Sequence, residues 1–186
     1  MASKSGLRKE FLRRRQLLSG QTATSKSDQI FRNVIRLKEL ISAQNFLVYL
    51  PVNNEVDTKQ IIKHLILQKS AVFVPAFLKG INTYKAAKFT GYTDLGEGPY
   101  KIPQPIKLST LDIDSVDVAI VPCLAFSKRG IRLGYGKGVY DRLLDDSSAL
   151  KIGVAYNFQV VDRIPREKHD LVMDIIVTES RLYKIT

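Results

Sequence analysis

The stretch VDVAIVPCLAFSKRGIRLGYGKGVYDRLL, residues 116–144, contains the pattern that decides the fold. Residues 116–122 are apolar apart from Asp117, which is typical of a strand buried on both faces of a parallel sheet. Glycines follow at 134, 136 and 138, and the run from Gly138 to about Asp146 predicts a short helix. Strand, glycine-rich turn and helix in this order indicate an α/β fold, whose ligands bind beyond the carboxyl ends of the strands.

Apolar runs on both sides of this stretch predict the rest of the sheet. The expected strands are residues 46–51, 71–77, 83–89, 151–156 and 174–178. These strands alternate with segments of helical spacing. We therefore predict a three-layer, mostly parallel, Rossmann-like α/β sheet with helices on both faces, and a single domain over residues 1–186.

Capping signals place the expected helices. Residues 3–19 predict a first helix ended by Gly20 in a left-handed cap. Ser25 or Ser27 is expected to cap a second helix, and Asp57 with Gln60 resembles a capping box that opens a third. Residues 94–105 are rich in glycine and proline, so we expect a functional or surface loop there.

Composition bounds the class of protein. The 186 residues are 45% hydrophobic and 25% charged, which allows a packed core and argues against disorder. The longest apolar run, residues 46–52, is far too short to span a bilayer, and no secretory h-region is visible. Cys123 is the only cysteine, so no internal disulfide can form and a cytoplasmic location is expected. A mitochondrial presequence is the alternative interpretation of the Arg-rich start, and Glu10 argues against it.

The net charge of +11 is concentrated in two short segments. Residues 1–15 carry six basic side chains and one acid, and residues 126–142 carry five basic side chains and one acid. Such a distribution could attract nucleic acid or a compact polyanion such as ATP. A solvated surface that only aids solubility explains the charge pattern alone equally well.

The glycine segment has the residue types of a phosphate cradle. Glycines accept positive φ, so successive backbone N–H groups can face an anion, and the following helix can add its dipole. Lys137 and Arg132 supply positive charge, and Asp141 is a candidate magnesium ligand beside phosphates. The spacing fits neither a Walker loop nor a dinucleotide fingerprint. A glycine-rich turn with no ligand, and a helix-terminal Asp141 that only favours the macrodipole, remain the structural alternatives.

Four segments together resemble the 5-formyltetrahydrofolate cyclo-ligase family, also called 5,10-methenyltetrahydrofolate synthetases. They are IVPCLAFSKRGIRLGYGKGVYDRLL (120–144), EKHD (167–170), EVDT (55–58) and KSGLR (4–8). The resemblance extends from Lys4 to about Glu179. It implies an ATP- and Mg²⁺-dependent closure of 5-formyltetrahydrofolate to 5,10-methenyltetrahydrofolate, with release of ADP and phosphate.

The resemblance also implies roles for individual residues. The implied ATP-binding residues are Lys4, Arg8, Arg132, Leu133, Gly134, Tyr135, Gly136, Lys137, Gly138, Val139 and Tyr140, with Lys137 and Arg132 as catalytic cations. Leu50, Glu55, Tyr135, Gly136, Lys137, Gly138 and Val139 would contact the folate. Asp141 and Asp170 would hold magnesium. The chain departs from the family pattern at Cys123, Ser127, Val139 and Gln104, where the family usually has Gly, Asp, Tyr and Glu.

The expected partner is 5-formyltetrahydrofolate, with or without a polyglutamate tail, and we expect a monomer that binds neither nucleic acid nor membrane. The chemistry requires no catalytic Ser, Cys or His, because the substrate supplies both nucleophiles. Two alternatives remain from the residues themselves: a basic nucleic-acid-binding module, and another nucleotide-using α/β enzyme.

Overall fold

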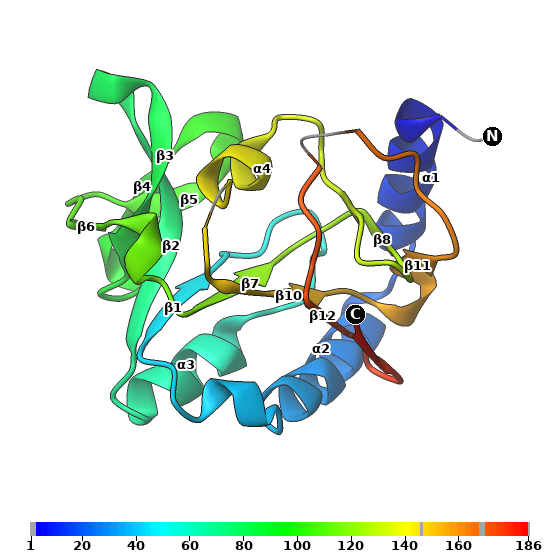
Figure 1. Ribbon diagram of the computed structural model, residues 1–186, viewed down its shortest axis with the longest axis horizontal. Coiled ribbons are helices and arrows are strands. Elements are labelled where there is room, and N and C mark those ends of the chain that lie inside the picture. The colour runs from blue at the N-terminus through cyan, green and yellow to red at the C-terminus, as the bar shows by residue number, and fades with distance from the viewer. Residues whose placement is uncertain (1–2, 146, 168–169, 186) are drawn as a thin grey trace.

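The computed structural model describes residues 3–145, 147–167 and 170–185, so Lys168 and His169 of the EKHD segment lie outside the described residues. Its centre is an eight-stranded sheet in the order β13-β12-β10-β7-β1-β2-β3-β6 (Figure 1). The strands are β1 (Asn45–Val48), β2 (Ala71–Leu78), β3 (Thr83–Lys88), β6 (Thr110–Leu111), β7 (Val118–Val121), β10 (Leu150–Val154), β12 (Ile175–Val177) and β13 (Leu182–Lys184). Pairings from β12 to β2 are parallel, and those of β13, β3 and β6 at the edges are antiparallel. The predicted mostly parallel sheet is confirmed.

The described residues form four α-helices. They are α1 (Lys4–Gln16), α2 (Gly20–Val34), α3 (Lys59–Leu67) and α4 (Val139–Leu143). The 3₁₀ turns are η1 (Lys38–Leu40), η2 (Lys79–Ile81), η3 (Tyr92–Asp94), η4 (Pro99–Lys101), η5 (Ile113–Ser115) and η6 (Asn157–Gln159). Figure 1 shows α2 and α3 on one side of the sheet and α4 on the other, which gives the three predicted layers.

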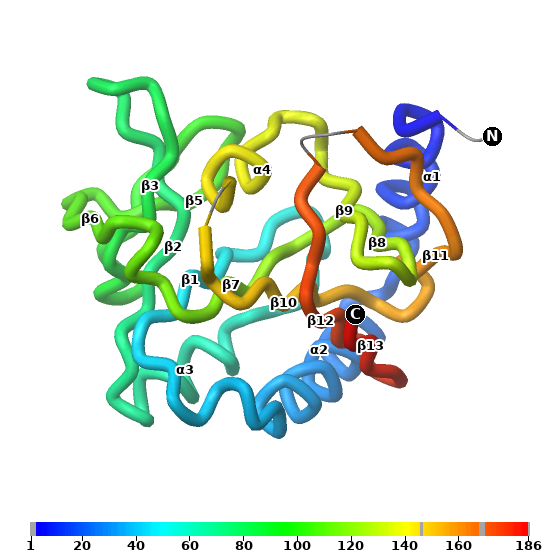
Figure 2. Tube along the Cα trace, viewed as in Figure 1, coloured from blue at the N-terminus to red at the C-terminus, as the bar shows by residue number. Residues whose placement is uncertain are grey.

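Two smaller sheets complete the fold. One contains β8 (Ala125–Ser127), β9 (Arg132–Leu133) and β11 (Val160–Val161), and α1 lies beside it in the tube view (Figure 2). The other is a hairpin of β4 (Leu95–Glu97) and β5 (Pro103–Pro105). The expectation of a loop over residues 94–105 thus missed two short strands. The two strands are three residues long and one contains two prolines, so they lack the alternation that predicts strands.

The helix starts differ from the predicted ones. Ser19 caps α2, because its hydroxyl accepts a hydrogen bond from the Thr22 N–H at 3.2 Å. Gly20 is thus the first residue of a helix and not the cap that ends the previous one, and neither Ser25 nor Ser27 begins a helix. The predicted capping box of Asp57 and Gln60 is also wrong: α3 begins after Thr58, which makes no side-chain capping bond. The last predicted helix, 138–146, is shorter than expected at Val139–Leu143.

The order of the strands determines which edge of the sheet stays uncovered. From β1 the chain crosses through α3 to β2, its neighbour on one side. It later returns as β7 on the other side of β1 and continues away through β10 to β12. Connections therefore diverge at the β1–β7 pair, and the carboxyl ends of these two strands remain uncovered between them.

The core lies mainly between the central sheet and its helices, and a smaller cluster of Phe11, Leu124, Ala125, Leu133 and Ile164 lies under α1. Phe158 packs against both clusters and so connects them. The single domain over residues 1–186 stays a prediction. Within the described residues, no helix is long and apolar enough to cross a membrane.

Gly153 on β10 gives a test of this core. A Cβ added there would lie 2.5 Å from the buried ring of Phe126, closer than any real contact. We expect Gly153→Ala to lower the free energy of unfolding by about 1 to 3 kcal/mol, because the ring has to move in a close-packed interior. Urea denaturation measures the change. Gly20→Ala is the control, since nothing lies within 4 Å of its added Cβ, and an equal loss in both variants would contradict the prediction.

Candidate active site

A cavity of about 630 Å³ opens at the carboxyl ends of β1 and β7. Tyr49 and Leu50, which directly follow β1, and Pro122, which directly follows β7, line it. The segment from Arg132 to Arg142 forms one wall, and Tyr100 and Pro103 of the β4–β5 hairpin contribute to the lining as well. The glycine segment therefore lies at the edge of the sheet where the sequence placed it, and the binding role of this edge stays a prediction.

Two of the three glycines of this segment have the positive φ that the sequence argument allows, and Gly134 does not. Gly136 has a φ of 88° and Gly138 a φ of 62°, both in the region that glycine adopts at low cost. A Cβ at Gly136 would also lie 3.3 Å from the guanidinium carbon of Arg8, so the loop allows a close approach to α1. The following helix, α4, has only five residues, so the expected dipole contribution at its start is small.

The two cationic segments meet at the cavity, as the family resemblance implies. Lys4 and Arg8 from α1 line it together with Lys137 of the glycine loop. Arg8 Nε donates a hydrogen bond to the carbonyl oxygen of Gly134 at 3.0 Å, which ties α1 to the loop. Lys4 Nζ lies 2.7 Å from both carboxylate oxygens of Asp170.

Lys137 and Arg132 differ in their freedom to reach a ligand. Lys137 is exposed, and its Nζ lies 4.9 Å from the centre of the Tyr100 ring across the cavity. Arg132 is buried, donates from Nε to the Pro122 carbonyl at 2.8 Å, and its Nη1 lies 3.5 Å from Asp141 Oδ2. Arg132 therefore fastens the loop to the end of β7 while its guanidinium lines the cavity.

The other residues implied to bind ATP differ in how deeply they are buried. Leu133 and Tyr140 are buried, and Leu133 packs in the small core cluster, so this leucine offers a ligand mainly its backbone. Gly134 and Val139 are half-buried in the cavity wall. Valine at 139 leaves the wall without the aromatic ring that the family usually has there.

Asp141 and Asp170 have the chemistry of a magnesium site. Both line the cavity, and the Leu171 N–H donates to Asp141 Oδ1 at 3.3 Å, which places the residue after Asp170 against Asp141. Mg²⁺ prefers hard oxygen donors and often takes one or two carboxylates together with phosphate oxygens. No cluster of three or more His, Cys, Asp or Glu that could hold a metal occurs in the described part of the chain. A pair of carboxylates thus fits a metal that is completed by substrate oxygens, and not a metal held by protein alone.

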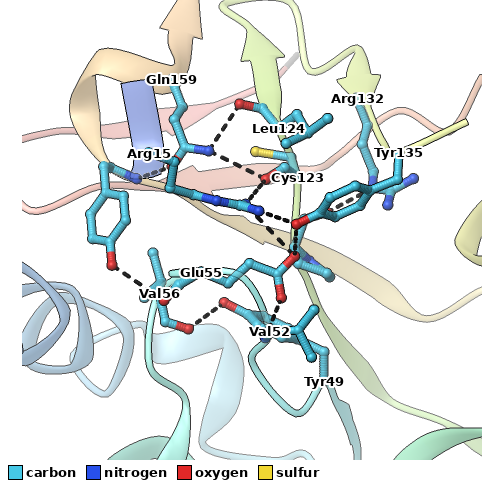
Figure 3. Close-up of polar contacts among 12 residues, drawn as sticks. Arg15, Tyr49, Val52, Glu55, Val56, Cys123, Leu124, Arg132, Tyr135 and Gln159 are labelled. Carbon is cyan, nitrogen blue, oxygen red and sulfur yellow. Dashed lines mark hydrogen bonds and ion pairs between the residues drawn. The ribbon is translucent and has the colours of Figure 1, made fainter. Parts of the chain in front are cut away.

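Glu55 and Leu50 form the wall opposite the glycine loop. Leu50 is buried, and Glu55 is 8% exposed. Glu55 Oε2 accepts from the Val52 N–H at 3.0 Å, and Oε1 accepts from the Tyr135 hydroxyl at 3.2 Å (Figure 3). Burial raises the pKa of Glu55, and the Arg15 guanidinium, 3.7 Å away, opposes that rise. Burial and the nearby Glu55 carboxylate raise the pKa of Tyr135 to about 12, so its hydroxyl stays a donor at neutral pH.

The sequence interpretation missed Arg15, which it counted only among the basic charges of residues 1–15. Its side chain is fully buried and its Nη1 donates to the Cys123 carbonyl at 3.1 Å. A signal was present, because Arg15 is four residues after the buried Phe11 and thus on the same face of the helix. Tyr84, within the strand predicted over residues 83–89, also lines the cavity, and its buried hydroxyl has no partner among the described residues.

The remaining departures from the family pattern have local structural roles. The hydroxyl of Ser127 accepts from the Ile131 N–H at 3.1 Å in the turn between β8 and β9, a role that an aspartate can also fill. Gln104 Oε1 accepts from the Phe77 N–H at 2.9 Å and joins the hairpin to β2. Cys123 is buried, which raises the pKa of its thiol.

Comparison with known proteins gives a consistent picture. The model of the 5-formyltetrahydrofolate cyclo-ligase family matches residues 1–179. The chain is 27% identical to the mouse 5-formyltetrahydrofolate cyclo-ligase, over 96% of this chain and 95% of that protein. It is 30% identical to the enzyme of the same name from Mycolicibacterium smegmatis, with 96% and 95% covered. The NMR structure of 5,10-methenyltetrahydrofolate synthetase from Aquifex aeolicus superposes with a TM-score of 0.87 at 34% identity, covering 98% of this chain and 92% of that one.

The raised pKa of Glu55 predicts how this residue affects stability. Its protonated form is favoured in the folded protein, so its contribution is present below the ordinary value of 4.5 and is lost as the pH rises through the higher folded pKa. We expect the difference in unfolding free energy between the wild type and Glu55→Gln to decrease as the pH rises from about 4.5 to neutrality. Urea denaturation at each pH measures it, with the exposed Glu97→Gln as control. A difference that grows with pH would mean that the ion pair with Arg15 outweighs burial.

Proposed function

Because the chain belongs to the 5-formyltetrahydrofolate cyclo-ligase family, we propose that it uses ATP and Mg²⁺ to convert 5-formyltetrahydrofolate to 5,10-methenyltetrahydrofolate, with release of ADP and phosphate. The observation that carries the proposal is that a glycine-rich loop, cations from two distant segments, and the Leu50–Glu55 wall share one cavity. Phosphate-binding and ring-binding surfaces therefore face each other across the space in which a phosphoryl group would move.

The reaction that we propose has two steps. The formyl group on N5 is an amide, so its carbon is a poor electrophile and its oxygen leaves poorly. Transfer of the γ-phosphoryl group from ATP to the formyl oxygen breaks the bond to ADP and turns that oxygen into a good leaving group. N10 then attacks the formyl carbon and gives up its proton to solvent, the ring closes, and the oxygen departs as phosphate.

This chemistry needs no nucleophile from the protein. Cys123 is buried and its pKa is raised, which keeps its thiol protonated and unreactive. His64 is on α3, packs against Phe31 and does not line the cavity. The protein instead aligns the two substrates and neutralises charge on the phosphate oxygens, and these are the main ways in which enzymes accelerate phosphoryl transfer.

We assign the phosphate-binding role to Lys4, Arg8 and the loop from Arg132 to Tyr140. Lys137 is the mobile cation that follows the transferred group, and Arg132 holds the loop in place as well as adding charge. Tyr135 to Val139 face both ligands, and Leu50 with Glu55 contacts the folate. Asp141 and Asp170 would hold Mg²⁺, which when bound neutralises charge on the phosphate oxygens.

The rival interpretation as a nucleic-acid-binding module fits this geometry less well. The cations of the two segments converge on a cavity and have acidic partners there, such as Asp170 for Lys4 and Asp141 for Arg132. A surface that binds nucleic acid presents its cations to the phosphate backbone. The monomeric state, the cytoplasmic location and the acceptance of a polyglutamate tail stay predictions.

One assay tests the proposed function. Purified protein is mixed with ATP, Mg²⁺ and 5-formyltetrahydrofolate, and the methenyl product is followed by its near-ultraviolet absorbance, with ADP measured in parallel. We expect both products in equal amounts, and omission of ATP abolishes both. No methenyl product, together with binding of DNA or RNA that weakens steeply with salt, would support the rival instead.

Lys137→Ala tests the proposed catalytic cation. Removing one group that stabilises the transition state typically costs about 3 kcal/mol, so we expect turnover to fall about a hundredfold. Because Lys137 is exposed, the melting temperature should change little. Lys63→Ala on α3, outside the cavity lining, is the matched control and should turn over normally. Near-normal turnover of Lys137→Ala would remove the residue from its assigned role.

Asp141→Asn tests the proposed metal ligand. The neutral amide attracts a cation less strongly than a carboxylate, so the Mg²⁺ concentration for half-maximal rate should rise by about tenfold or more. Titration of Mg²⁺ at saturating ATP measures it. Asp114→Asn, at an exposed position of η5, is the control. An unchanged titration curve for Asp141→Asn would contradict the assignment.

A further inference from the structure

Arg15 is a buried charge at the junction of three parts of the molecule. It leaves α1 on the face that also carries Phe11, and its guanidinium lies between the Cys123 carbonyl, the Tyr135 hydroxyl and the Glu55 carboxylate (Figure 3). Arg15 is absent from the lining of the cavity, whereas Glu55 and Tyr135 both line it. Any effect of Arg15 on a ligand must therefore pass through these two side chains.

The energetics of Arg15 favour a role other than stability. Its Nε is buried and has no hydrogen-bond partner among the residues that the structure describes. Its ion pair with Glu55 spans 3.7 Å, which is long for a pair that has lost its water. Buried ion pairs of this kind can often be replaced by apolar side chains without loss of stability. A fully buried arginine with an unsatisfied N–H is thus better explained by what it holds in place.

What Arg15 holds is the contact between the two sides of the cavity. Its Nη2 donates to the Tyr135 hydroxyl, and that hydroxyl donates to Glu55 Oε1. Tyr135 belongs to the glycine loop, and Glu55 belongs to the segment after β1. The Tyr135 ring also lies 5.4 Å from the guanidinium carbon, so ring and hydroxyl are both fixed by the same group.

Resting on the proposed function, we propose that Arg15 is a positioning residue for folate binding, which fixes the Glu55 carboxylate and the Tyr135 side chain at the cavity wall. A pterin ring presents N–H donors along one edge, and an ionised, immobile carboxylate accepts such donors well. Arg15 opposes the rise in the pKa of Glu55 that burial causes, and so favours the ionised carboxylate. It also keeps the tyrosine from turning into the space of the ring.

The environment of Glu55 decides the expected pH dependence. The charged and titratable groups that face it are Arg15 from α1, Arg132 from β9, Tyr135 from the loop, Tyr49 after β1, Tyr140 from α4 and the Cys123 thiol. Burial raises the pKa of Glu55, and Arg15 is the leading influence that lowers it. Loss of the Arg15 charge should therefore move the protonation of Glu55 to higher pH.

The experiment compares Arg15→Met with Arg15→Lys, Tyr135→Phe and the control Arg13→Met, an exposed arginine of the same helix. For Arg15→Met we expect the KM for 5-formyltetrahydrofolate to rise about tenfold or more, with kcat per active site and the KM for ATP changed by less than about threefold. The pH below which this KM increases should move upward. Arg15→Lys keeps the positive charge but loses the planar guanidinium with its several donors. The pH profile of its folate KM should therefore stay near that of the wild type.

A merely structural role predicts a different pattern. It would lower the melting temperature and the fraction of active sites while leaving the folate KM unchanged, and that outcome overturns the proposal. If Arg15→Met does not fold, the other two variants decide: an unchanged folate KM in both Arg15→Lys and Tyr135→Phe overturns it as well.

Calorimetric binding of 5-formyltetrahydrofolate separates this proposal from the proposed function. A wild type that binds the folate but forms no methenyl product would overturn the proposed function, and the dissociation constants of the variants would still test Arg15. The expected result is weaker binding in Arg15→Met and unaltered binding in Arg13→Met. A wild type with no affinity for the folate overturns both proposals.

Discussion

The parallel pairing of β1 with β7 is the constraint on which the site depends. The register places Phe46 beside Val118 and Val48 beside Ile120, so both strands end at the same level. The crossover to β2 leaves in one direction and the continuation to β10 in the other. Because such parallel crossovers are right-handed, the two connections cover opposite faces of the sheet. The segments after the two strands, beginning at Tyr49 and Pro122, are therefore free to line a hollow. This arrangement determines the positions of Glu55, Arg132 and the glycine loop.

The site is electrostatically balanced before any ligand arrives. Lys4 pairs with Asp170, Arg15 with Glu55, and Arg132 with Asp141. The first two pairs join segments far apart in the chain, and Arg132 and Asp141 lie nine residues apart. The +11 charge that looks uneven in sequence is therefore partly neutralised in space. A bound polyanion would compete for these cations and release carboxylates toward a metal ion. The charged side chains of the cavity thus pair with one another before a ligand binds, and these pairs can be exchanged for pairs with a ligand.

Most of the central sheet could be predicted from the sequence, because its strands are apolar runs bounded by polar residues. The site edge and the meeting of residues 4–8 with the glycine loop followed from the same pattern together with the family resemblance. What could not be predicted depends on tertiary contacts. The β4–β5 hairpin has no alternation to detect, and Ser19 competes with equally suitable serines as a helix cap. Arg15 is one of three adjacent arginines, and only the packing of α1 against β8 shows which of them is buried.

The close approach of Gly153 to Phe126 restricts how such a sequence can change over time. A larger residue at one position requires a smaller residue at the other, and either change made first leaves a strained or hollow interior. Two simultaneous changes are rare, so glycine and the aromatic ring should be inherited together among descendants of this chain. Amino-acid changes are then more easily tolerated on the exposed faces of α2 and α3, which are far less constrained than the strands beneath them.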